Sequence, residues 1–165
     1  MAETQSPRAL SHVGLTVEDV EAAATWYEDV LGFQRLFGPE RIERGEGHFG
    51  RLLDDGDAKF QWLSIVHLIT GNHIGLELLE FDDTNGSADP TPPAPGLDHL
   101  CVVDPEVGAL AETIAEHGGE HVKDVWTLYP EREYEMTYCR DPFGNRIEIH
   151  SHSYEQAHAN ISTYE

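Results

Sequence analysis

The sequence has few basic residues. Lysine and arginine together number 10, against 31 aspartate and glutamate residues, and the formal net charge is -21. Because this charge repels phosphate backbones and anionic lipid surfaces, we expect neither nucleic acid nor a membrane as a partner. The scarcity of basic side chains also disfavours phosphorylated ligands and coenzyme A, and favours a neutral, hydroxyl-rich small molecule as the substrate. The alternative is that the charge reflects a salt-rich or acid-tolerant source and is unrelated to the ligand.

Long apolar runs and a basic N-terminal segment are also missing. No apolar stretch approaches the roughly 20 residues that cross a bilayer, and the opening MAETQSPRAL lacks both parts of a secretory signal. The 165 residues, 39% of them hydrophobic, suffice for one ordinary domain or two small modules that share a core. We therefore predict a soluble, cytoplasmic protein. Both cysteines, Cys101 and Cys139, lie in apolar strand-like segments and are expected to be buried free thiols.

The chain contains the same pattern twice. A strand-like stretch over residues 9–17 precedes apolar residues at helical spacing and Gly32, where a helix would end. Residues 96–119 repeat the strand, the helical spacing and the terminal glycine. Each half continues with further strand-like segments, namely KFQWLSIVHLIT and IGLELLEF in the first, and EHVKDVWTLY, EYEMTYCR and NRIEIHSH in the second. The duplication predicts an α+β fold of two βαβββ modules in one chain.

Composition places the boundaries of these modules. The first module is expected over 9–81 and the second over 97–150, with a C-terminal tail over 151–165. Between the modules, 82–96 reads DDTNGSADPTPPAPG, a composition typical of a linker. The first half also carries extra residues over 41–57, which we predict to be an irregular loop or an added strand.

Histidine and glutamate occur at matching points of the two halves. His12 and His99 lie near the start of each first strand, and Glu77 and Glu148 lie in each last strand. A single strand histidine is more often structural than a ligand, and a single glutamate usually faces solvent. Chance, however, rarely places both residue types at equivalent points twice. We therefore predict that these four side chains bind one divalent metal ion, because mixed imidazole and carboxylate ligands suit such ions.

Other histidines share these strand faces, because side chains alternate along a strand. His73 is predicted on the face of Glu77, and His150 and His152 on the face of Glu148. A spacing of two residues along a strand is about 6–7 Å, which is too far for both residues to bind one ion comfortably. His150 is therefore predicted to support a ligand or line the substrate pocket, and His152 to lie at the surface. We assign no partner to two others, His48 and His67.

The later strands also carry aromatic residues. We predict that His150, Tyr138 and Trp126 line the substrate pocket. For each of the aromatic residues, including Tyr129 and Tyr134, packing in the core or on the surface is the alternative.

Several segments together resemble the vicinal oxygen chelate superfamily, namely LSHVGLTVEDVEAAATWYEDVLGF, IGLELLEF, LDHLCVVDPEVGALAETIAEHGG and DPFGNRIEI. This superfamily includes glyoxalase I, methylmalonyl-CoA epimerase and 2-epi-5-epi-valiolone epimerase-like proteins. The resemblance covers about residues 9–150 and implies the glyoxalase/bleomycin resistance/dioxygenase fold. In that fold each module curls into a half-barrel of mixed sheet with flanking helices, and a metal binds in the cleft. The family's ligand positions fall on His12, Glu77, His99 and Glu148. A homodimer is also implied, with the site inside one chain or shared across chains.

The same resemblance narrows the reaction. By this resemblance, the metal-ligand set of extradiol dioxygenases is a triad of two histidines and one carboxylate, whereas here Glu77 fills an additional ligand position. We predict a metal-dependent epimerase or isomerase that removes a proton α to a carbonyl and returns it through a metal-stabilised enolate or enediolate. Either Glu148 or Glu77 is the catalytic base. Zn²⁺ is the default ion, while Ni²⁺, Co²⁺, Mn²⁺ and Fe²⁺ also suit the ligands.

The expected substrate is a neutral polyhydroxylated ketone, such as a cyclitol of the 2-epi-5-epi-valiolone type in secondary metabolism. The alternatives, in order, are a glyoxalase I-like lyase, an Fe(II) extradiol dioxygenase and a metal-free binding or resistance protein.

Overall fold

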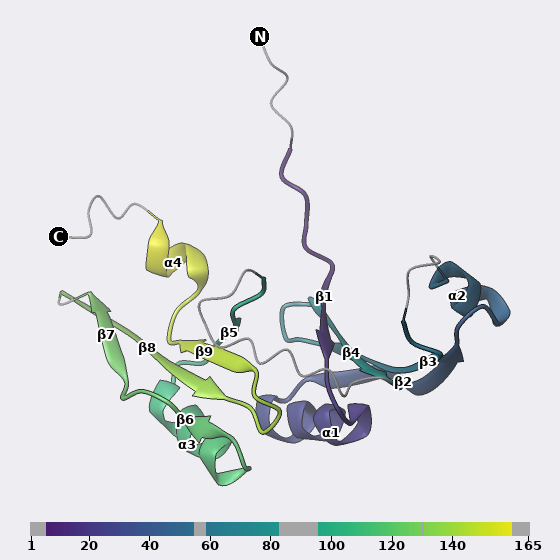
Figure 1. Cartoon of the computed structure of the whole chain (residues 1–165). Helices are drawn as coiled ribbons and strands as arrows, with labels where there is room; N and C mark the ends of the chain where they lie inside the picture. The colour runs from purple at the N-terminus through teal and green to yellow at the C-terminus, as the bar shows by residue number, and fades with distance from the viewer. Residues whose placement is uncertain (1–5, 55–58, 83–95, 130, 160–165) are drawn as a thin grey trace. The chain divides into compact units, whose positions relative to one another are not determined.

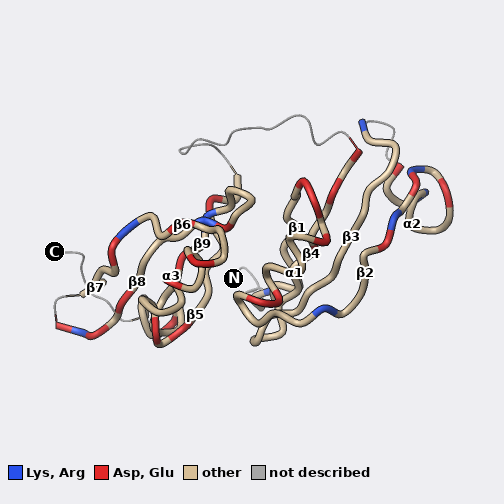
Figure 2. Tube along the Cα trace, turned by 90° about the horizontal axis from the view of Figure 1, so that it is seen from below, with Lys and Arg blue, Asp and Glu red and all other residues tan. Residues whose placement is uncertain are grey.

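The structure is a computed structural model that describes residues 6–54, 59–82, 96–129 and 131–159. The chain divides into two compact units, Met1–Ser87 and Ala88–Glu165, and each unit has its own β-sheet (Figure 1). Within the described ranges, no helix is both long enough and apolar enough to cross a membrane. Acidic positions occur along both units (Figure 2), so the negative charge is not confined to one segment.

The first unit is a four-stranded sheet with one long helix. Its elements in chain order are β1 (His12–Thr16), α1 (Val20–Leu31), β2 (Gln34–Glu43), α2 (Gly47–Leu52), β3 (Trp62–Ile69) and β4 (Gly75–Phe81). The strand order is β1-β4-β3-β2, in which β1 runs parallel to β4 and the other pairs are antiparallel. The order of elements is the predicted β-α-β-β-β with one short helix added.

Helix α1 has defined ends, and its N-terminus is hydrogen-bonded to the sheet. The Asp19 side chain caps its N-terminus, and Gly32 ends it with φ 67°, a left-handed conformation that glycine adopts without strain. The first helical amide, of Val20, donates to Glu80 Oε2 on β4 at 3.0 Å. Glu80 therefore serves the helix, while Glu77, three positions earlier on β4, belongs to the opposite face. The apolar side of α1 is buried, as the helical spacing predicted, through Val20, Ala23, Ala24, Tyr27 and Val30.

The second unit repeats this arrangement. Its elements are β5 (Leu100–Val103), α3 (Val107–Glu116), β6 (Glu120–His121), β7 (Trp126–Tyr129), β8 (Arg132–Arg140), β9 (Arg146–His150) and α4 (Tyr154–His158). The strand order is β5-β9-β8-β6, and β7 pairs with β8. Here β5 runs parallel to β9, the counterpart of β1 beside β4 in the first unit. The core between helix and sheet contains Val107, Ala111, Ile114, Cys139, Ile147 and Ile149.

Three segments differ from the sequence-based expectation. The strand-like segment EHVKDVWTLY forms two short strands, β6 and β7, rather than one. Over 41–54, the described part of the predicted loop or added strand, β2 extends to residue 43 and the short helix α2 follows. Residues 55–58 lie outside the described part. The segment after β9 contains helix α4, which Ser153 and Gln156 cap reciprocally, and whose Ala157 carbonyl accepts a hydrogen bond from Tyr129 Oη at 2.8 Å. Most of the expected linker, 83–95, also lies outside the described residues.

Candidate metal centre

The first unit brings His12 and Glu77 together on one face of its sheet. In the parallel pairing of β1 with β4, Gly14 lies opposite Glu77 and His12 lies opposite Gly75. His12 is therefore a diagonal neighbour of Glu77, and its Nε2 lies 3.7 Å from Glu77 Oε2. A Cβ added at Gly75 would lie 2.9 Å from His12 Cβ, so the imidazole needs a glycine beside it. The other ring nitrogen, Nδ1, lies 3.3 Å from Ser11 Oγ.

The second unit has the same arrangement with shorter distances. Cys101 lies opposite Glu148 in the pairing of β5 with β9, and His99 immediately precedes β5. His99 Nε2 lies 3.1 Å from Glu148 Oε2, and its Nδ1 lies 2.9 Å from Asp98 Oδ2. Asp98 also pairs with Arg146 Nη1 at 2.9 Å. The hydrogen bond with His99, followed by the charge of Arg146, lowers the pKa of the Asp98 carboxyl below its ordinary value.

The repeated geometry suits metal coordination. In each unit the histidine directs Nε2 toward the glutamate of the last strand and Nδ1 toward the residue just before it in the chain. The ionised Asp98 only accepts hydrogen bonds, so His99 Nδ1 is the donor in this pair, and Nε2 is the nitrogen that would offer a lone pair to a cation. Metal-binding histidines typically have such a partner on the second nitrogen. The donors present therefore fit a divalent cation.

His67, for which the sequence predicted no partner, is a neighbour of Glu77. The antiparallel pairing of β3 with β4 places it directly opposite Glu77, with His67 Nδ1 3.5 Å from Glu77 Oε1. The signal was the turn TGNH between the two strands, because the length of a hairpin turn sets which residues face each other. Counting outward from the pair Ile69 and Gly75 leads to His67 and Glu77.

Tyr138 occupies the equivalent position in the second unit, opposite Glu148 in the pairing of β8 with β9. Burial and then the neighbouring Glu148 raise the pKa of Tyr138 to about 12, so its hydroxyl keeps its proton at neutral pH. Burial by itself raises the pKa of Glu148, but Tyr138, then His150 and His99, outweigh it, and the net pKa is below the ordinary value. Glu148 is therefore ionised at neutral pH.

His150 is closer to Glu148 than the strand spacing predicted. Its Nε2 lies 3.2 Å from Glu148 Oε1, so the expectation that the two are too far apart for one ion is wrong. Strand side chains lean along the strand, which shortens the distance between their ends. The residue is only 4% exposed, and Nε2 makes no hydrogen bond with the described residues.

The two cysteines differ in their surroundings. Cys139 is buried as predicted, and burial raises its pKa to about 11. Cys101 is exposed, which contradicts the prediction, because it lies on the sheet face of Glu148 rather than on the face that α3 covers. The protein atoms around its sulfur, and then the charge of Glu148, nonetheless raise the pKa of Cys101 to about 12.

The remaining predicted residues are placed as follows. His73 lies in the turn before β4 with φ 62°, so its predicted position on the strand face of Glu77 is wrong. His152 is half-buried, with its ring centroid 4.0 Å from that of Tyr134. Trp126 is 69% exposed and pairs with Met136, the neighbour of His150, which places Trp126 on the sheet face of Glu148. That His150, Tyr138 and Trp126 line a substrate pocket stays a prediction.

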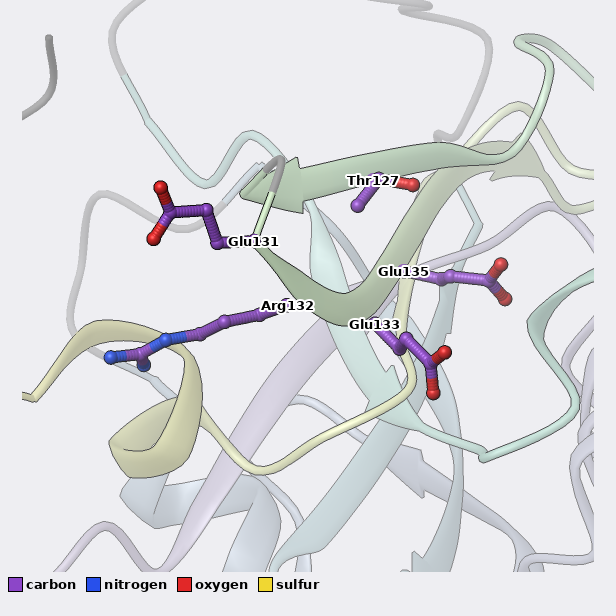
Figure 3. Close-up of a pocket in the computed structure, with 5 residues that line it drawn as sticks. All are labelled: Thr127, Glu131, Arg132, Glu133 and Glu135. Atoms are coloured by element: carbon purple, nitrogen blue, oxygen red, sulfur yellow. The ribbon is translucent and has the colours of Figure 1, made fainter.

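A separate, open pocket lies at the hairpin of β7 and β8. Its lining contains Thr127, Arg132 and three glutamates, and all five residues are exposed. Figure 3 shows Glu131 and Arg132 pointing away from Glu133 and Glu135. None of the predicted metal ligands lines it.

Comparison with known proteins identifies the family. The family model of the Glyoxalase/Bleomycin resistance protein/Dioxygenase superfamily matches residues 9–149. The structure of a glyoxalase family protein from Bacillus cereus is 25% identical with a TM-score of 0.64, and the match covers 91% of this chain and 97% of that one. No curated protein matches the sequence.

Two more distant structures share the fold. A mutant of the fosfomycin resistance protein FosX from Listeria monocytogenes, complexed with Mn(II) and 1S,2S-dihydroxypropylphosphonic acid, is 16% identical with a TM-score of 0.59, over 92% of this chain and 97% of that one. Glyoxalase I from Zea mays is 19% identical with a TM-score of 0.57, over 87% of this chain and 44% of that one.

The chain belongs to the Glyoxalase/Bleomycin resistance protein/Dioxygenase superfamily, which is the vicinal oxygen chelate superfamily that the motifs predicted. The predicted α+β fold of curled, unclosed sheets is confirmed. Membership supports a metal-dependent enzyme as the general class of protein.

Proposed function

We propose that the protein is a metal-dependent epimerase or isomerase that removes a proton α to a carbonyl and returns it. The observation that carries this proposal is the repeated histidine–glutamate pair, His12 with Glu77 and His99 with Glu148. A pair that occurs once is common in proteins, whereas the same pair at equivalent strand positions of two units favours a shared task.

In this proposal His12, Glu77, His99 and Glu148 hold one divalent cation, within one chain or across a dimer. Zn²⁺ is the default, and Ni²⁺, Co²⁺, Mn²⁺ and Fe²⁺ suit the same ligands. When bound, such a cation supplies Lewis-acid stabilisation of negative charge on the substrate oxygens.

The protein's own groups move the proton. Glu148 is ionised at neutral pH because its pKa is lowered, so its carboxylate is able to accept a proton from a carbon acid. Tyr138 keeps its hydroxyl proton and provides a hydrogen-bond donor beside Glu148. Glu77 has His12 and His67 as its neighbours and is the second carboxylate that can hold the proton. Return of the proton to the opposite face of the same carbon gives an epimer.

The negative charge of the protein supports a neutral substrate. We propose a polyhydroxylated ketone, such as a cyclitol of the 2-epi-5-epi-valiolone type. The same two glutamates would also serve a glyoxalase I-like lyase, in which the proton returns to the neighbouring carbon.

Proton exchange with solvent tests the proposal directly. The protein, purified without a metal-affinity tag, is assayed for bound metal and then incubated in D₂O with a panel of neutral α-hydroxyketones. We expect at least one divalent ion per chain and deuterium in the substrate at the carbon next to the carbonyl, by NMR. The matched variant Glu148→Gln, which keeps the size of the side chain but not its basicity, should lose most of the exchange.

Other outcomes would assign the protein to another class. Oxygen consumption with catechols, without deuterium exchange, would replace the proposal with a dioxygenase. Absence of both metal and turnover would replace it with a binding or resistance protein. Migration of the deuterium to the neighbouring carbon would indicate the lyase.

We also propose that the protein acts as a homodimer in the cytoplasm. The superfamily resemblance supports the dimer, and light scattering of the purified protein measures it. A monomeric mass with intact metal binding would contradict this part and leave the catalytic proposal unchanged.

A further inference from the structure

The strand pairing of the second unit collects more donor atoms than the histidine–glutamate pair. Cys101 lies directly opposite Glu148, and His150 follows Glu148 two positions later on the same strand face. One possible ligand atom from each of these three residues lies within 4.8 Å of the other two. These three residues come from two hydrogen-bonded strands of a single unit, so their arrangement does not depend on the first unit.

His150 indicates that something binds there. The side chain is 4% exposed, and its Nε2 has no hydrogen bond with any described residue, although Glu148 Oε1 lies 3.2 Å away. A buried polar atom without a hydrogen bond costs roughly 1–3 kcal/mol, so such atoms usually have a ligand, ion or water as a partner. The atom is directed at the carboxylate that faces Cys101.

The two oxygens of Glu148 face different neighbours. Oε2 lies 3.1 Å from His99, whereas Oε1 lies 3.2 Å from His150. Glu148 is therefore able to contribute Oε1 as a ligand to a second cation site. Cys101 is an exposed residue, so a cation can approach its side of the cluster from solvent.

We propose that Cys101, Glu148 and His150 bind a thiophilic divalent cation of the Zn²⁺ type in the second unit alone. A thiolate, an imidazole and a carboxylate are ligands that Zn²⁺ takes at about 2.0–2.3 Å, and three protein ligands leave a position open for water or substrate. The thiolate favours Zn²⁺, Cd²⁺ or Co²⁺ over Mn²⁺ and Mg²⁺, which prefer oxygen ligands. The inference goes beyond the proposed function, because the ligand set implied by the superfamily contains neither Cys101 nor His150.

Cobalt substitution tests this site in the full-length protein. A thiolate bound to Co²⁺ gives a sulfur-to-cobalt charge-transfer band in the near ultraviolet, which nitrogen and oxygen ligands do not give. We expect this band in the wild-type protein and its complete loss in Cys101→Ser, which keeps the buried Cys139 as an internal control. The band should persist in a variant with both His12→Ala and Glu77→Gln. Cys101→Ser should also weaken Zn²⁺ binding by about tenfold or more, with little change for Mn²⁺.

The outcomes separate this inference from the proposed function. Bound cobalt without a charge-transfer band, or a band that survives Cys101→Ser, overturns the thiolate site and leaves the proposed function standing. Loss of the band in the variant of the first unit overturns the claim that the second unit suffices. Absence of any bound cation overturns both. Circular dichroism of Cys101→Ser confirms folding, which an exposed, isosteric change should preserve.

Discussion

The residues that precede the two histidines proposed as metal ligands should contribute unequally to metal affinity. His99 Nδ1 lies 2.9 Å from a carboxylate oxygen of Asp98, whereas His12 Nδ1 lies 3.3 Å from the hydroxyl of Ser11. A charged partner at shorter distance orients the ring and raises the basicity of Nε2 more strongly. We therefore expect Asp98→Ala to weaken cation binding more than the matched change Ser11→Ala.

The magnitude follows from the effect of such partners in other metal sites. Loss of a group that orients a ligand typically costs about 10–100-fold in affinity, which corresponds to about 1.4–2.7 kcal/mol. At a cation concentration of 100 times the wild-type Kd, binding stabilises the fold by about 2.7 kcal/mol, and a tenfold weaker variant retains only about 1.4 kcal/mol. For a chain of this length that loss lowers the Tm by roughly 3–5 °C. Ser11→Ala should weaken cation binding by less than tenfold.

Competition with a chelating dye measures Kd for each variant, and thermal unfolding with and without cation gives the stabilisation. The metal-free Tm of Asp98→Ala serves as the control, because this change also removes the exposed pair with Arg146. Equal affinity in the wild-type protein and Asp98→Ala would refute the orienting role. A larger loss in Ser11→Ala would refute the ranking of the two units.

Four further predictions concern stability and charge. Asp141→Ala should cost about 3 kcal/mol in urea unfolding, because the buried carboxylate accepts three hydrogen bonds within its turn, each worth about 1 kcal/mol; an unchanged midpoint would contradict this. Glu80→Ala should cost about 1 kcal/mol, because the amide of Val20 loses its acceptor, and Glu80→Gln should cost less; equal losses in the two variants would show that the hydrogen bond is unimportant. Tyr138→Phe should raise the pKa of Glu148 in the metal-free protein, since Tyr138 is the largest influence that lowers it. Carbon NMR titration measures this pKa, and an unchanged value would contradict the prediction. Since the folded pKa of Glu148 is lowered, the stabilisation from its charge is present above the unfolded pKa of about 4.3 and is lost as the pH falls through the folded pKa. The free energies of unfolding of Glu148→Gln and the wild-type protein should therefore approach each other as the pH is lowered.

The sequence predicted the parts of the fold that follow from local periodicity. The buried positions of α1 and its end at Gly32 follow from helical spacing and from the conformational freedom of glycine. Helix α2 could not be predicted in this way, because its sequence GHFGRL has two glycines and little helical tendency. The structure shows why Gly50 is present, since a Cβ there would overlap the carbonyl oxygen of Glu43. The close approach of α2 to the end of β2 therefore requires glycine at this position.

For the candidate site, too, the sequence predicted what lies within one segment better than what depends on contacts between segments. Alternation within a strand, together with the duplication, singled out Glu77 and Glu148, because that information lies in one segment at a time. The pairing of His67 with Glu77 depends on register across a hairpin, which requires the turn geometry as well. The approach of His150 to Glu148, and the exposure of Cys101, depend on how side chains lean and on which face the helix covers. The last two are not encoded in residue spacing.

The glycine opposite His12 offers an indirect means of engineering the protein. Any side chain at position 75 would meet the Cβ of His12 and displace the ring from its present place beside Glu77. A small library at Gly75 would thus shift the His12 ring by different amounts, while all four proposed metal ligands stay chemically unchanged. Directed evolution of ion preference could begin at this position, which carries no functional group of its own.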